Sequence, residues 1–115
     1  MPAQDTTEAV FAHHLQAVRD SDVDAIVEDY AADAIIMTTD GVFHGIDQVR
    51  MLFTNVFNGL PPEVPRNLQV DRLDIDGEFV FILWSSGPVV QSATDTLCIR
   101  DGKIVMQSMF AVFGS

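Results

Sequence analysis

Apolar residues recur at helical spacing in three segments of the first half of the chain. These segments are residues 5–20, residues 23–30 behind the N-cap residue Asp22, and residues 46–57. Their apolar faces comprise Val10, Phe11, Leu15 and Val18; Val23, Ile26, Val27 and Tyr30; and Ile46, Val49, Leu52, Phe53, Val56 and Phe57. The pattern therefore predicts three helices, with Gly59 as the C-cap of the third.

The rest of the pattern is typical of β-strands. Residues 34–37 are apolar on both faces, and a turn at residues 40–41 joins them to a short strand over residues 42–44. Four longer strands are expected over residues 68–75, 79–84, 88–99 and 104–113. The apolar phase slips between Val70 and Leu73, which predicts a β-bulge and a bend in the sheet. The order of elements indicates an α+β domain in which helices cover one face of a bent antiparallel meander.

The strand over residues 79–84 is apolar at every position. Alternation places Phe79, Phe81 and Leu83 on one face and Val80, Ile82 and Trp84 on the other. We assign the face with Trp84 to the outer surface of the sheet. An apolar outer face needs a cover, and a symmetric partner is the simplest one. We therefore expect a homodimer through the outer sheet face, including Trp84.

Composition narrows the class of protein. A chain of 115 residues, 48% of them hydrophobic, suits one domain over residues 1–115 with a sizeable core. The formal net charge of −11 repels phosphate backbones and anionic lipids, so we expect neither a nucleic acid nor a membrane as a partner. The single Cys98 excludes an internal disulfide bond. The first residues lack a secretory-signal pattern and no apolar run reaches transmembrane length, so a cytoplasmic protein is expected.

Three stretches of sequence carry a family resemblance. DVDAIVEDYAADAIIMTTDGVFHGIDQVRMLF, DIDGEFVFILWSS and TDTLCIRDGKIVMQSMF resemble the SnoaL-like, ketosteroid-isomerase-like branch of the nuclear transport factor 2-like superfamily. The resemblance implies a cystatin-like cone, in which a curved antiparallel sheet wraps around three N-terminal helices and leaves a cavity at its open end. Members include ketosteroid isomerases, polyketide cyclases, epoxide hydrolases and scytalone dehydratase, and also binding domains without chemistry. The fold therefore does not select a reaction.

The ketosteroid isomerase motif maps onto this chain only in part. The position of the isomerase's carboxylate base is occupied by Thr38, whose hydroxyl does not take a proton unaided at neutral pH. The position of its oxyanion tyrosine is occupied by His14, and its second oxyanion group falls near Asp95. Tyr30 and Phe53 fall where that enzyme has aromatic pocket residues. The missing base disfavours classical ketosteroid isomerase activity.

His14 and Asp95 are the candidate catalytic pair. A carboxylate beside an imidazole would orient it and raise its basicity, so that His14 acts as a general acid or base. The alternatives are a structural His14 that bonds a carbonyl or Tyr30, and an Asp95 that pairs with Arg100, Arg72 or a partner subunit. The residues expected to contact a substrate are Tyr30, Met37, Thr38, Phe53, Phe57 and Phe110.

The expected function is that of a small-molecule pocket. We expect a compact apolar or aromatic ligand and, if there is turnover, acid/base chemistry of the isomerase, dehydratase or epoxide hydrolase type. No cofactor or metal is expected, because the three histidines are dispersed and no nucleotide-binding motif appears. The alternative is a non-catalytic dimeric interaction or carrier module whose cone is filled by side chains. Residues 59–65 are expected to form a helix-free connector or a lid at the mouth of the cone.

Overall fold

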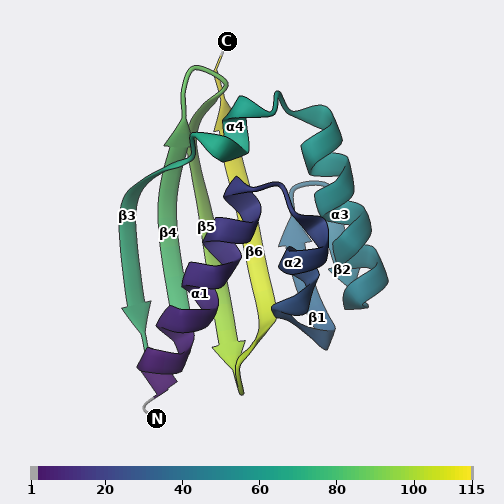
Figure 1. Ribbon diagram of the computed structural model, residues 1–115, viewed down its shortest axis with the longest axis vertical. Helices are drawn as coiled ribbons and strands as arrows, with labels where there is room; N and C mark the ends of the chain where they lie inside the picture. Colours follow the sequence, from purple (N-terminus) through teal and green to yellow (C-terminus); the bar gives the residue numbers. More distant parts are fainter. Residues whose placement is uncertain (1–2, 115) are drawn as a thin grey trace.

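The helices lie together on one face of a curved six-stranded sheet (Figure 1). The structure is a computed structural model, and it describes residues 3–114. The elements in chain order are α1 (Ala3–Arg19), α2 (Val23–Glu28), β1 (Tyr30–Thr38), β2 (Gly41–His44), α3 (Gly45–Gly59), α4 (Glu63–Arg66), β3 (Gln69–Asp76), β4 (Phe79–Ser86), β5 (Val90–Arg100) and β6 (Lys103–Phe113). This arrangement confirms the predicted α+β class, with a curved, unclosed sheet against N-terminal helices.

The strand order is β2-β1-β6-β5-β4-β3. Strands β3 to β6 form the predicted antiparallel meander, and the short β1–β2 pair joins its far edge. That junction is parallel, because β1 runs alongside the last strand, β6. The predicted bulge is present: the β3–β4 register shifts between Val70 and Arg72.

Two local predictions were wrong. Tyr30 does not end the second helix but begins β1, because Asp29 caps the helix and its carbonyl accepts a 2.7 Å hydrogen bond from the Ile104 amide of β6. The segment predicted to be free of helix contains α4, a single turn. Proline is tolerated in the first turn of a helix because the amides there have no intrahelical acceptor, so Pro65 does not prevent this turn.

The predicted orientation of Trp84 was also wrong. Val80 and Ile82 belong to the main core between the helices and the sheet, and Trp84 packs against it. The outer face of β4 is the other one, with Phe79, which is 55% exposed. Strict alternation fixes which residues share a face, but a strand that is apolar on both faces does not reveal which face meets the helices.

Two side-chain hydrogen bonds hold α1 against the two ends of β3. Arg19 donates a 3.0 Å hydrogen bond to the Leu68 carbonyl just before β3, and Thr7 donates one of 2.7 Å to the Gly77 carbonyl at its far end. Between these contacts, the side chains of Phe11 and His14 are buried between the helix and the sheet. The helix is therefore tied at both ends, with His14 in its middle. No helix among the described residues has the length and apolar character needed to span a membrane.

Candidate functional site

The space between helices and sheet is not completely filled. A cavity of about 70 Å³, which we call the inner cavity, lies among α1, α3, α4 and strands β4 to β6. Its wall is apolar, with residues such as Phe11, Phe53 and Phe57. Two titratable side chains interrupt this apolar wall, His14 from α1 and Asp95 from β5.

A second cavity of about 160 Å³, the outer cavity, lies beside the first. Thr38, Thr39 and Asp40 from the end of β1 and its turn line it, together with aromatic residues near the end of β6. The residues that line both cavities are Val56, Trp84, Asp95 and Met109. Asp95 therefore stands at the boundary between an apolar inner space and a more polar outer one.

His14 is a buried imidazole whose Nδ1 has no hydrogen-bond partner among the described residues. Only 5% of His14 is exposed. Its ring meets the rings of Tyr30 and Phe53 edge-on, at centroid distances of 5.8 and 6.2 Å. Burial, and to a lesser degree the neighbouring His13, lowers the pKa of His14 from 6.5 to about 4. The imidazole is therefore neutral near pH 7, with one ring nitrogen as a donor and the other as an acceptor.

Asp95 has two neutral N–H donors as its partners. The Gln107 side chain donates to Oδ2 at 3.1 Å, and the Trp84 indole donates to Oδ1 at 3.5 Å. Burial raises the pKa of Asp95 from 3.8 to about 6, while the hydrogen bonds from Trp84 and Gln107 hold it lower than burial alone would. The carboxyl group therefore titrates close to neutral pH.

Gln107 is the residue of this site that the sequence analysis missed. It is 1% exposed on β6, and its Oε1 accepts a hydrogen bond from the Tyr30 hydroxyl. Because its carbonyl end faces Tyr30, its NH₂ end faces Asp95, and the three side chains form a chain of hydrogen bonds across β1, β6 and β5. One signal could have found it: Gln107 is a polar residue at an inward position of a mostly apolar strand, two residues before Met109.

His14 and Asp95 share a cavity but do not form the predicted direct pair. Both side chains line the inner cavity, but no hydrogen bond joins them. The predicted alternatives for Asp95 within this chain are also absent, because Arg72 pairs with Asp74 at 2.7 Å and Arg100 pairs with Glu78 at 3.3 Å. The catalytic role of the pair stays a prediction.

The other predicted site residues divide between the two cavities and the rest of the fold. Phe53 and Phe57 line the inner cavity, and Thr38 and Phe110 line the outer one. Tyr30 lies behind His14, where it contacts the imidazole. Placing Met37 at the pocket was wrong: its neighbour Ile36 is fully buried in the core, so Met37 points to the opposite face, where it is 48% exposed.

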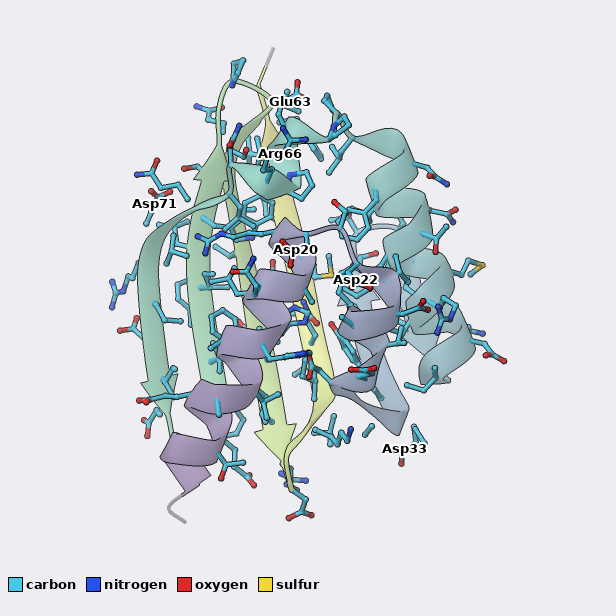
Figure 2. The ribbon with its side chains drawn as sticks, viewed as in Figure 1. Asp20, Asp22, Asp33, Glu63, Arg66 and Asp71 are labelled. Atoms are coloured by element: carbon cyan, nitrogen blue, oxygen red, sulfur yellow. The ribbon has the colours of Figure 1, made fainter. Side chains whose placement is uncertain are left out.

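Most of the negative charge lies away from this site. Asp33 and Asp71 are exposed and point away from the space between helices and sheet (Figure 2). Within the part of the chain that the structure describes, no Lys or Arg lines either cavity. The charged groups that do are Asp95 and, in the outer cavity, Asp40.

Comparisons with known structures support the fold. A SnoaL-like protein of unknown function from Burkholderia thailandensis superimposes with a TM-score of 0.76 at 15% identity, over 97% of this chain and 99% of that one. An NTF2-like protein of unknown function from Mesorhizobium loti gives a TM-score of 0.78 at 14% identity, over 97% and 95% of the two chains. A protein of unknown function with a cystatin-like fold from Methylobium petroleophilum gives 0.74 at 15% identity, over 95% and 77%. At such identities the likeness concerns the fold alone.

The sequence comparisons give the family. No curated protein matches this chain. The family model of the SnoaL-like domain matches residues 11–107, which include all of α2 to β5 together with His14, Asp95 and Gln107. The resemblance noted in the sequence is therefore confirmed over most of the chain, and the protein belongs to the family of SnoaL-like domains.

Proposed function

We propose that this chain binds a compact apolar or aromatic small molecule in the inner and outer cavities. The carrying observation is His14, which lines the inner cavity and whose Nδ1 has no partner among the residues that the structure describes. Buried polar atoms almost always have hydrogen-bond partners, and leaving one without a partner costs about 1–3 kcal/mol. A ligand with a hydroxyl or carbonyl group would satisfy the imidazole while its apolar part fills the cavity.

The dimensions favour a small ligand. Sites for drug-sized molecules span roughly 300–1,000 Å³, whereas the two cavities here measure about 70 and about 160 Å³. A cavity of about 150 Å³ lined by aliphatic and aromatic side chains holds benzene. One ring with a short substituent is therefore the expected size.

A thermal-shift series with phenol, benzyl alcohol and cyclohexanone tests this proposal. We expect saturable increases in Tm, because a ligand that binds only the folded state stabilises it. Val56 lines both cavities, so Val56→Phe should fill the space and abolish the shift. The matched control is Met51→Phe on the same helix, at a position that is 50% exposed and lines neither cavity, which should leave the shift unchanged. Absence of a shift with all three compounds would overturn the proposal in favour of a non-catalytic module.

Cofactor-free proton transfer by Asp95 is a second candidate function. Asp95 is a carboxyl group with a pKa of about 6, and it lines the same cavity as a neutral imidazole. Such a group is an efficient proton acceptor near neutral pH. In this scheme Asp95 removes a proton from the substrate and His14 donates a hydrogen bond to the oxygen that gains negative charge. Exchange of α-hydrogens of cyclohexanone with D₂O, followed by NMR, should then be faster with the unaltered protein than with Asp95→Asn, and equal rates would contradict this role.

We also propose that the outer sheet face forms a homodimer interface. Met37, Val42 and Phe110 are all about half exposed on that face. Their neighbours across the strands are mainly apolar or hydroxyl residues such as Thr94 and Ser108. A face of this kind is typical of a surface that another copy covers. Trp84 takes no part in it, because its side chain lies on the helix side of the sheet.

A further inference from the structure

We infer that the two cavities select an organic cation, a compact aromatic ammonium compound whose nitrogen pairs with Asp95 at the boundary between them. This inference rests on the proposed binding function and specifies the chemical class of its ligand. It follows from the charges around the cavities, from the partners of Asp95 and from the aromatic wall.

The charged side chains that line the two cavities are carboxylates, and no Lys or Arg is among the described lining residues. Asp95 lines both cavities and Asp40 lines the outer one. His14 is the only basic side chain among the described lining residues, and burial keeps it neutral by lowering its pKa to about 4. An anionic ligand would meet two carboxylates and no compensating cation, so the site disfavours carboxylic acids and phosphates.

Asp95 itself lacks a counter-ion. Its partners Trp84 and Gln107 donate neutral N–H groups, and none of the described Lys and Arg side chains reaches it. A partly buried carboxylate without an opposite charge is costly, and a cationic group beside it recovers part of that cost. An ammonium group in the cavity would supply three N–H donors to the oxygen atoms of Asp95.

The other groups around Asp95 do not change this balance. On α1, His14 is neutral, and on β1, the Tyr30 hydroxyl stays protonated because burial and the charge of Asp95 raise its pKa. Asp40, in the turn after β1, adds a second negative charge to the outer cavity. The residues that α3, α4, β4 and β6 contribute to the two walls carry no charge.

Aromatic rings around the boundary provide a second attraction for a cation. The Trp84 indole bonds to Asp95 and lines both cavities. Phe53 and Phe57 lie on the inner side, and Phe113 lies on the outer side. Cations within about 6 Å of such rings are attracted by the negative face of the π-system, and more strongly so when water is excluded. The same rings accommodate the apolar body of the ligand.

Three probes of matched size test the inference: benzylamine, benzyl alcohol and benzoate, which are cationic, neutral and anionic. Their dissociation constants are measured by NMR titration of the unaltered protein at about pH 8 and about pH 5, on either side of the Asp95 pKa of about 6. At the higher pH we expect benzylamine to bind at least about tenfold more tightly than benzyl alcohol, and benzoate not to bind. At the lower pH, where Asp95 is mostly protonated, benzylamine should lose most of this advantage.

The variant Asp95→Asn removes the charge and keeps one acceptor oxygen, which can serve one of the two donors, Trp84 or Gln107. It should bind benzyl alcohol normally and lose the preference for benzylamine. Asp33→Asn is the matched control, because it changes the net charge equally at an exposed position that lines neither cavity. If Asp95→Asn does not fold, the pH series on the unaltered protein decides the question alone.

The possible failures are distinguishable. If none of the three probes binds, the proposed pocket function fails. If benzyl alcohol binds but benzylamine binds no better at about pH 8, or benzoate binds equally well, the pocket exists and the preference for a cation is overturned. A preference for benzylamine that Asp33→Asn reduces as much as Asp95→Asn does would reflect the overall negative charge, and would also overturn pairing with Asp95.

Discussion

Gln107 holds Asp95 through a 3.1 Å hydrogen bond from its side-chain N–H. The amide has only one orientation that serves both of its neighbours, because its oxygen accepts the hydrogen of the Tyr30 hydroxyl. Tyr30 and Asp95 therefore favour the same orientation of the amide, with its N–H end toward the carboxyl group. A carboxyl group held in this way keeps its direction toward the cavities without a charged partner.

Replacing Gln107 by leucine should therefore affect both stability and titration. Gln107→Leu leaves the buried Tyr30 hydroxyl unpaired, which should reduce the free energy of unfolding by about 1–3 kcal/mol in urea denaturation. It also removes a donor that stabilises the carboxylate, so the pKa of Asp95 should rise further, as read by NMR. Tyr30→Phe is the control: it should destabilise the fold but leave the Asp95 pKa nearly unchanged. Equal pKa changes in the two variants would refute the arrangement.

Asp95 should make folding less favourable as the pH rises. Its pKa is about 6 when folded against 3.8 as the ordinary value, so between these values the folded chain holds more protons at this group than the unfolded chain does. The free energy of unfolding of Asp95→Asn, relative to the unaltered protein, should therefore increase from about pH 4 to about pH 6, by at most about 3 kcal/mol. Urea denaturation across this range measures it, and parallel curves for the two proteins would contradict the raised pKa of Asp95.

His14 should have the opposite dependence. Its pKa is about 4 when folded against 6.5 ordinarily, so the unfolded chain takes up the proton first and stability is lost as the pH falls through this range. His14→Phe should therefore become more stable relative to the unaltered protein on acidification from about pH 6.5 to about pH 4, by about 3 kcal/mol at most. His13→Phe is the contrasting variant, because His13 is exposed and bonded to Asp29, whose interaction raises its pKa. Acid stabilisation of both variants alike would argue against a buried neutral His14.

Charges on the outer sheet face should dissociate the proposed dimer. Met37→Lys combined with Phe110→Lys places like charges on both copies across the interface, so sedimentation velocity should show a monomer where the unaltered protein is a dimer. Leu73→Lys is the control: Leu73 is 42% exposed but pairs with Ile82 on the helix side of the sheet. A monomeric unaltered protein at micromolar concentration would rule the dimer out.

The sequence was most informative where one face of an element is polar. The face of α3 with Val49, Leu52 and Phe53 was predicted correctly, because the opposite face is mostly polar. The orientation of β4 could not be predicted, since both of its faces are apolar and only contact with the helices distinguishes them. The length of β1 was underestimated for a related reason. Tyr30 pairs with Ile104, and a partner so distant in sequence leaves no local signal.

For the candidate site, the sequence named side chains but not their partners. His14 and Asp95 were recognised through a family resemblance, and both line the inner cavity. The amide between Tyr30 and Asp95 was not anticipated, because glutamine carries no charge and has no characteristic spacing. Hydrogen bonds between strands that are far apart in the chain depend on register, which becomes known only with the sheet itself.

The parallel pairing of β1 with β6 has a consequence for synthesis on the ribosome. β1 is made early, but its neighbour in the sheet is β6, the last strand of this domain. Until that strand leaves the exit tunnel, one edge of β1 has no partner, and neither the sheet nor the Tyr30–Gln107–Asp95 chain can be completed. The nascent domain must therefore wait for its final residues before it can close, and in this interval it depends most on protection from aggregation.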